Sequence, residues 1–211
     1  MELLAPAGSL ETAAAAFQYG ADAVYAGMKC FSARADAQNF DHEELAVLLG
    51  MARNAPERPR KVYIALNTLI REEELPRLHE ELTILDRYRP DAIIIQDPAL
   101  IHYVRSYFPE LTIHASTQMA VHNPAGMERC RELGFSRVIS ARELTLQELA
   151  EMAKVPGIEL EVFVHGALCY AYSGICLLSS VLNGHSGNRG DCSYVCRNCW
   201  KVTGENGRQL S

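Results

Sequence analysis

The chain lacks the features that direct a protein to or through a membrane. Its first eleven residues contain no basic region followed by a long apolar core, so they do not resemble a secretion signal. No stretch approaches the roughly 20 consecutive apolar residues that are needed to cross a bilayer. These absences predict a cytoplasmic protein that has no membrane partner.

Several catalytic motifs are also missing. The sequence contains neither the GxSxG pattern of serine hydrolases nor the HExxH pattern of zinc peptidases. Ser179 and Ser180 have no evident His and Asp partners at a fixed spacing. No glycine-rich dinucleotide fingerprint follows the first predicted strand. The absence of these motifs argues against a nucleophilic hydrolase and against a dinucleotide-binding protein.

An excess of positive charge is missing as well. The 211 residues include 20 basic and 26 acidic side chains, which gives a formal net charge of −6. Sequence-independent binding to phosphates depends on many Lys and Arg contacts. The charge therefore argues against broad nucleic-acid binding, although a local basic patch remains compatible with it.

One long stretch lacks charge altogether. Residues 162–188 contain no Asp, Glu, Lys or Arg. This stretch and the residues just after it hold four of the seven cysteines: Cys169, Cys176, Cys192 and Cys196. An odd number of cysteines without a secretion signal argues against a disulfide framework, and clustered cysteines then indicate metal binding or catalysis.

The remaining sequence repeats a short apolar run, a turn and an amphipathic helix. The runs predict strands at residues 2–5, 21–27, 61–66, 91–95, 112–115, 137–140 and 159–164. Ser9 and Asp41 are suitable N-caps for the first two helices. Apolar strands that alternate with helices are typical of a parallel sheet. Seven such units favour a TIM-barrel-like (β/α) barrel, with an open α/β sheet as the alternative.

The pattern ends one unit short of eight. We expect a barrel core over residues 1–166, a Cys-rich segment packed at the barrel mouth over residues 167–199, and an extension over residues 200–211. A hairpin is predicted around residues 204–207. We also expect that the native protein continues beyond Ser211 and that the chain is truncated.

Polar residues follow the predicted strands at the ends where barrel enzymes place their sites. This set comprises Tyr25, Asn67, Gln96, Asp97, Ser116, Gln118, Arg142, Glu143 and His165. Such a ring suits a polar ligand. There are simpler alternatives: Asn67 and Asp97 can be helix caps, Arg142 and Glu143 can be a surface pair, and His114 fits a core position.

The cysteine spacing leaves three interpretations open. On a regular helix, Cys169 and Cys176 would lie roughly 10.5 Å apart along the axis, so a shared cluster requires a bend, which Gly174 permits. A structural zinc site is the second possibility, because four Cys is a common zinc shell and Cys196 and Cys199 have CxxC spacing. The third is that Cys169 and Cys176 are buried apolar residues, as we interpret Cys30 and Cys130.

One signature resembles a known family. It is formed by Glu161, Phe163, Gly166, Ala167, Leu168, Cys169, Gly174, Cys176, Leu178 and Ser179. This pattern resembles the signature of peptidase family U32, the collagenase-like proteases, and the likeness extends over essentially the whole chain.

The resemblance implies either of two activities. The family was named for proteolysis, but better-understood relatives are oxygen-independent hydroxylation factors for tRNA, rRNA or a quinone precursor. These relatives carry a 4Fe–4S cluster held by four cysteines, and some use prephenate as the oxygen donor. By position, Cys169, Cys176 and Cys192 match the cluster ligands, with Cys196 or a later cysteine as the fourth. Cys199 departs from the usual pattern.

We therefore expect an iron–sulfur enzyme that hydroxylates RNA. His165, Arg142, Gln118 and Ser116 are the candidate catalytic residues, and Arg142 would suit a carboxylate donor. The predicted substrate-binding residues are Asn67, Gln96, Asp97, Glu143 and Tyr25. The alternatives are an endopeptidase with a peptide substrate and a non-catalytic domain stabilised by zinc.

Overall fold

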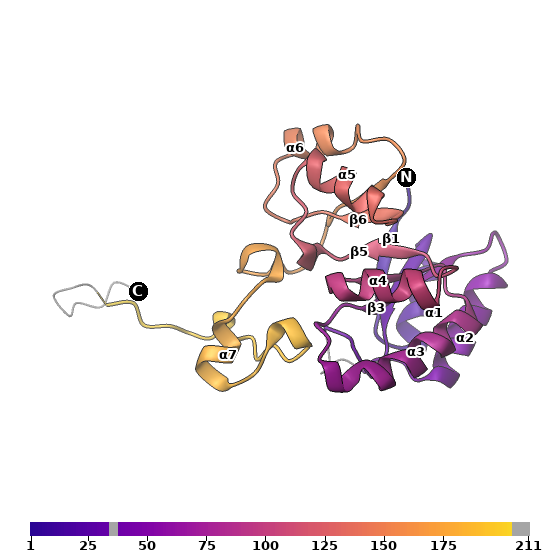
Figure 1. Ribbon diagram of the computed structural model, residues 1–211, viewed down its shortest axis with the longest axis horizontal. Helices are drawn as coiled ribbons and strands as arrows, with labels where there is room; N and C mark the ends of the chain where they lie inside the picture. Colours follow the sequence, from indigo (N-terminus) through magenta and orange to yellow (C-terminus); the bar gives the residue numbers. More distant parts are fainter. Residues whose placement is uncertain (34–37, 204–211) are drawn as a thin grey trace.

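A single parallel sheet organises the chain. The computed structural model describes residues 1–33 and 38–203 (Figure 1). All strand pairs are parallel, and the strands follow one another in chain order from β1 to β7. The strands are β1 (Leu4–Ala7), β2 (Ala23–Gly27), β3 (Lys61–Leu66), β4 (Ala92–Ile95), β5 (Ile113–Ala115), β6 (Arg137–Ile139) and β7 (Glu159–Glu161).

Helices connect consecutive strands and cover the outer face of the sheet (Figure 1). They are α1 (Leu10–Gln18), α2 (His42–Arg53), α3 (Leu75–Tyr88), α4 (Pro98–Tyr107), α5 (Pro124–Glu132) and α6 (Leu146–Met152). As predicted, Ser9 and Asp41 cap α1 and α2, and each side chain accepts a hydrogen bond from a backbone N–H in the first turn. Leu48, Ile64 and Leu82 belong to the large apolar core.

The sheet is curled rather than flat. Arg137 in β6 forms an ion pair with Glu2, which lies two residues before β1, at 2.7 Å. The Tyr63 hydroxyl of β3 donates to the same carboxylate at 2.8 Å. Because β1 and β6 are far apart in the strand order, these contacts require the sheet to close towards itself. This half-barrel confirms the predicted (β/α)-barrel class.

The observed strand bounds differ from the predictions at every strand except β3, and the largest differences are at β7 and β1. The seventh strand stops at Glu161 and not at residue 164, because β7 pairs only with β6 and the last pair of that register is Ile139 with Glu161. The first strand is shifted to Leu4–Ala7 and includes Pro6. A proline is tolerated there because β1 lies at an edge of the described sheet.

The segment after β7 contains mostly short helical turns. They are η3 (Tyr172–Gly174), α7 (Leu178–Asn183), η4 (Gly187–Arg189) and η5 (Val195–Arg197). Figure 1 places α7 to one side of the sheet and its covering helices. The predicted hairpin at residues 204–207 lies outside the described residues. In the described part of the chain, no helix has the length and apolar character that a membrane span requires.

Candidate functional site

Amide side chains are linked at the carboxyl ends of the middle strands. The Asn67 side chain, after β3, donates to Gln118 Oε1 at 3.1 Å. Gln96, after β4, donates from Nε2 to the Asn67 carbonyl oxygen at 2.7 Å. The same Gln96 nitrogen lies 3.2 Å from the carbonyl oxygen of Asn188. Three of the predicted site residues therefore form one network, and this network extends to the Cys-rich segment.

Asp97 and Ser116 lie at the same edge but serve the backbone. Asp97 caps α4 by accepting from Ala99 N at 2.8 Å, and its second oxygen accepts from Ile70 N at 2.9 Å. Ser116 is 1% exposed and accepts from Gln118 N at 3.3 Å as the cap of η2 (Thr117–Met119). Both side chains hold the loops that carry the amide network. Asp97 is therefore a helix cap, as the simpler of the two sequence interpretations predicted.

Arg142 and Glu143 have different neighbours and do not pair with each other in a salt bridge. The Arg142 guanidinium carbon lies 5.8 Å from the centre of the Phe163 ring, and its buried Nε has no hydrogen-bond partner among the described residues. Glu143 accepts from the backbone N–H and the hydroxyl of Ser173, the latter at 2.7 Å. Burial alone would raise the pKa of Glu143, but these hydrogen bonds lower it.

Tyr25 and His165 complete the predicted set. Tyr25 is half-buried in β2 and packs against the apolar cluster on the inner face of the sheet. His165 is exposed beyond the end of β7, and no hydrogen bond or ring contact joins it to the other described site residues. The described geometry brings Asn67, Gln96 and Gln118 together and leaves His165 apart from them.

Residues 188–190, which we call the docking segment, attach the Cys-rich segment to the barrel. The Asn188 carbonyl oxygen accepts from Leu69 N at 3.2 Å. Arg189 forms a two-pronged contact with Glu74, at 2.6 and 3.0 Å, and also donates to the Leu69 carbonyl oxygen at 2.7 Å. A Cβ at Gly190 would lie 2.3 Å from the Ser32 carbonyl oxygen, so only glycine fits there.

Sequence reasoning missed this attachment. The only local signal is the Gly-Asn-Arg-Gly run of residues 187–190 between two of the candidate ligands. Arg189 in this run contacts Glu74, which lies in η1 (Glu72–Glu74). In the sequence, Glu74 belongs to a short acidic run that is ordinary for the first turn of a helix, so nothing local indicates this contact. The hydrogen bonds from Arg189 lower the pKa of Glu74, so this carboxylate is charged when it holds the segment.

All four candidate cluster cysteines are free thiols. Cys169 is exposed, and Cys176, Cys192 and Cys196 are half-buried. Two of them contact the start of α7: Leu178 N donates to Cys176 Sγ at 3.3 Å, and Ser179 Oγ lies 3.8 Å from Cys192 Sγ.

The remaining pair is connected through neighbouring residues. Arg197, next to Cys196, donates to the carbonyl oxygen of Leu168, next to Cys169, at 2.8 Å.

The donor set is the one that an iron–sulfur cluster requires. Five free thiols, the four candidates and Cys199, lie in the Cys-rich segment, and a backbone N–H already donates to the sulfur of Cys176, as such groups do to cluster sulfurs. Among the described residues, no three His, Cys, Asp or Glu side chains are arranged as a metal-binding group. The chemistry of the thiols fits the cluster, and their convergence on one centre stays a prediction.

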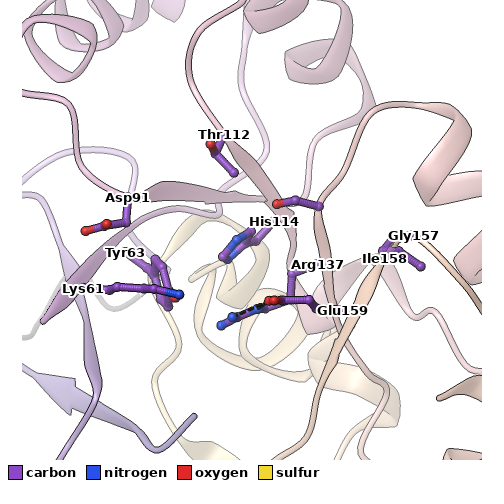
Figure 2. Close-up of a pocket in the computed structure, with 10 residues that line it drawn as sticks. Lys61, Tyr63, Asp91, Thr112, His114, Arg137, Gly157, Ile158 and Glu159 are labelled. Carbon is purple, nitrogen blue, oxygen red and sulfur yellow. Dashed lines mark hydrogen bonds and ion pairs between the residues drawn. The ribbon is translucent and has the colours of Figure 1, made fainter. Parts of the chain in front are cut away.

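A second polar cluster lies at the opposite, amino ends of the strands, where Lys61, Arg137 and Glu159 begin β3, β6 and β7. Figure 2 shows the side chains of this cluster. The cluster lines a cavity of about 510 Å³ whose walls include Lys61, Tyr63, His114, Arg137 and Glu159. Besides its contact with Glu2, Arg137 pairs with Glu159 at 2.5 Å and with Glu161 at 3.2 Å. Since barrel enzymes carry their chemistry at the carboxyl ends of strands, we interpret this amino-end cluster as a stabilising feature.

The charges in this cluster have perturbed pKa values. Burial raises the pKa of Glu2, but hydrogen bonds from Arg137, Lys61 and Tyr63 outweigh it and lower the value to about 2. Burial, followed by repulsion from Arg137, lowers the pKa of His114 to about 3. His114 is 4% exposed, and its ring stacks edge-on against Tyr63 with 4.8 Å between the ring centres. It is a core histidine, as the simpler interpretation predicted.

Comparison with known proteins gives two relevant relatives. The chain is 42% identical over 209 residues to tRNA hydroxylation protein P of Escherichia coli (strain K12), covering 99% of this chain and 45% of that protein. It is 35% identical over 211 residues to the 23S rRNA 5-hydroxycytidine C2501 synthase of the same organism, covering 100% of this chain and 31% of that protein. The chain thus spans less than half the length of either relative.

A solved structure and a family profile complete the comparison. The U32 peptidase Mk0906 aligns with a TM-score of 0.66 and 17% identity, over 81% of this chain and 70% of that one. At this identity the likeness supports the fold alone. The profile of peptidase family U32 matches residues 8–210. The chain belongs to peptidase family U32, as its signature predicts.

Proposed function

We propose that this protein takes part in the oxygen-independent hydroxylation of RNA, with tRNA or rRNA as the substrate and a 4Fe–4S cluster as the cofactor. The observation that carries the proposal is the 42% identity to a tRNA hydroxylation protein, which extends over 99% of the chain and includes the cysteine segment. The second relative, at 35% identity, is named for hydroxylation of rRNA.

In this proposal Cys169, Cys176, Cys192 and Cys196 hold the cluster. A bound cluster would supply one-electron redox chemistry. The docking segment would position Cys192, because Arg189 and Gly190 are held against the barrel immediately before it. The hydrogen bond from Leu178 N would stabilise the thiolate form of Cys176.

The carboxyl-end residues would bind the organic reactants. Arg142 has a buried guanidinium nitrogen without a partner among the described residues, which suits the carboxylate of a small donor such as prephenate. Asn67, Gln96 and Gln118 offer amide groups that hydrogen-bond the edges of unpaired bases. His165 and Glu143 are further candidates beyond the carboxyl ends of the strands, whereas Asp97 and Ser116 would act by holding the loops that carry the amide network. Tyr25 lies in the middle of β2 beside Tyr63, away from this edge, so its predicted role in substrate binding is the least supported of the set.

The reaction balances without molecular oxygen. A carbon of the RNA base exchanges its C–H bond for a C–O bond, while the donor's C–O bond breaks and the donor keeps the hydrogen. The RNA carbon is oxidised by two electrons, and the donor is reduced by the same two. The hydroxyl-bearing donor is therefore both the oxygen source and the electron acceptor.

Mass spectrometry of RNA nucleosides tests this function. We expect a hydroxylated nucleoside to disappear from cells in which the gene is disrupted, and to return with the wild-type gene. Complementation with Cys176→Ser should fail. Complementation with the control Cys30→Ala should succeed, because Cys30 lies outside the Cys-rich segment of residues 167–199. An unchanged nucleoside profile in the disrupted cells would contradict the proposal.

Proteolysis is the second candidate function, because the family is named for it and the aligned structure bears the same name. Incubation of the purified protein with denatured collagen and different divalent metals distinguishes the two. Cleavage that is lost with a site-directed variant, together with an unchanged RNA profile, would favour the peptidase. A zinc-stabilised domain without activity is the third possibility, and metal analysis identifies it.

A further inference from the structure

The residues that follow β7 carry an unusual number of exposed aromatic side chains. Tyr170 is 91% exposed, Tyr194 is 55% exposed and Trp200 is 54% exposed. Phe163 and Tyr172 are also exposed, at 46% and 51%. Rings of this size are normally buried or placed in an interface, so this concentration marks a binding surface.

Local contacts place two of these rings beside η5 and connect η5 to the chain near a third. The Trp200 indole N–H donates to the Val195 carbonyl oxygen at 3.0 Å, which folds residue 200 back onto η5. Tyr194 directly precedes η5 and has a left-handed backbone with φ of 52°. Arg197 in η5 donates to the carbonyl oxygen of Leu168, two residues before Tyr170. We name Tyr170, Tyr194 and Trp200 the aromatic surface.

The charge of this region differs in sign from that of the whole chain. Residues 162–203 contain three basic side chains, Arg189, Arg197 and Lys201, and one acidic side chain, Asp191, a net charge of +2 against −6 for the whole chain. Asp191 is paired with His185 at 2.7 Å, and Arg189 is paired with Glu74. Arg197 and Lys201 therefore supply positive charge beside the aromatic surface.

We infer that the aromatic surface stacks the unpaired bases of a single-stranded RNA loop. This inference rests on the proposed function and identifies where the substrate is held. Aromatic side chains bind unstacked bases through their π-faces, and a few cations guide the backbone. Because residues 162–188 hold no cation, phosphate contacts contribute little, and single-stranded loops are favoured over duplexes.

Binding of a fluorescently labelled RNA hairpin, followed by anisotropy, tests the inference. Tyr170→Ala and Tyr194→Ala should each weaken binding about tenfold, whereas Tyr170→Phe should bind as the wild type does. A blunt duplex with the same stem should bind at least tenfold more weakly than the hairpin. Tyr19→Ala and Tyr107→Ala are the controls. These tyrosines lie at the carboxyl ends of α1 and α4 and are 85% and 62% exposed, so their replacement should leave RNA binding unchanged.

Salt dependence gives an independent readout. A surface that binds by stacking predicts a shallow fall of affinity with salt, corresponding to about two phosphate contacts. A steep slope, equal affinity for hairpin and duplex, or unchanged binding by Tyr170→Ala would overturn the inference. So would a dimer that sedimentation detects in the wild type and not in Tyr170→Ala, since the rings would then bind a second copy.

The outcomes separate this inference from the proposed function. If Tyr170→Ala binds hairpins normally while the hydroxylated nucleoside still depends on the gene, the aromatic surface is refuted and RNA hydroxylation stands. If hairpin binding depends on the rings but no nucleoside depends on the gene, the surface is supported and hydroxylation is refuted.

Discussion

Arg137 is the residue on which the closure of the sheet depends most. Its side chain is 8% exposed and pairs with Glu2, Glu159 and Glu161. Its guanidinium carbon also lies 5.0 Å from the centre of the Tyr63 ring. Removing a buried cation leaves its carboxylate partners uncompensated, which costs more than the pair contributes by itself.

We predict that Arg137→Leu lowers the free energy of unfolding by roughly 3–5 kcal/mol. Urea denaturation of the purified protein measures this change. The matched control is Arg129→Leu, because Arg129 is 68% exposed and, among the described residues, forms one ion pair, with Glu132 at 3.0 Å. An exposed pair contributes at most about 1 kcal/mol. Equal losses for the two variants would contradict the assignment of Arg137.

His114 makes stability depend on pH. The pKa of His114 is about 3 in the folded protein and about 6.5 in the unfolded chain. Between these two pH values the unfolded chain binds a proton at His114 and the folded protein does not. The stability that neutral His114 contributes is complete above pH 6.5 and is lost as the pH falls towards 3. The free energy of unfolding should fall by up to about 1.4 kcal/mol per pH unit in this window.

Urea denaturation between pH 7.5 and pH 5 tests this dependence. His114→Gln should flatten the slope, because the titrating ring is gone while Tyr63, Arg137, Glu2 and Lys61 remain. Glu2 adds its own loss only below about pH 4.5, outside the range measured. The exposed His102 provides the control, and His102→Gln should keep the wild-type slope. Parallel curves for wild type and His114→Gln would refute the prediction.

Among the elements, η4 and the docking segment determine where Cys192 lies. Gly190 and Gly184 both have left-handed backbones, with φ of 87° and 73°. A Cβ at Gly190 would meet the Ser32 carbonyl oxygen at 2.3 Å, whereas nothing lies within 4 Å of one at Gly184. Alanine therefore introduces similar backbone strain at both positions and a collision at only one.

We predict that Gly190→Ala detaches the docking segment from the barrel and that Gly184→Ala leaves it attached. The rate at which a maleimide labels Cys192 measures this, in a background where the other six cysteines are replaced. Labelling should accelerate several-fold in Gly190→Ala, because the collision costs more than the roughly 1 kcal/mol of strain that both variants share. Equal rates in the two variants would show that contact with Ser32 does not hold the segment.

The ion pair between Arg189 and Glu74 gives a second test of the same attachment. Both side chains are about one-quarter exposed, at 27% and 26%, and the contact is two-pronged. Glu74→Gln should weaken it by about 1 kcal/mol or more and accelerate labelling of Cys192 about fivefold. Glu73→Gln is the control, because Glu73 lies in the same turn and is 70% exposed. Restored protection in Glu74→Arg with Arg189→Glu would establish that the pair itself matters.

At the scale of the whole molecule, local sequence patterns predicted the barrel but not its closure. The apolar run in β4 and the capping residues Ser9 and Asp41 act over a few residues, so they can be read directly. The contact between Arg137 and Glu2 spans 135 residues, and that between Arg189 and Glu74 spans 115. Such pairs depend on the curl of the sheet, which no local pattern encodes.

The candidate site was predictable in part for the same reason. The strand ends identified Asn67, Gln96 and Gln118, because carboxyl ends of parallel strands share one edge. The predicted end of β7, residue 164, lies three residues beyond the observed end at Glu161, because β7 can pair only as far as β6 extends. The candidate cluster cysteines were identified from their spacing and the family signature, and their role as ligands stays a prediction.

Metal and sulfide analysis of the anaerobically purified protein, with its visible spectrum, tests the central claim most directly. We predict about four iron atoms and four sulfides per chain, with broad visible absorption. Cys176→Ser and Cys192→Ser should lose the absorption, whereas Cys30→Ala should retain it. A colourless wild-type protein with one zinc per chain and no sulfide would contradict the claim.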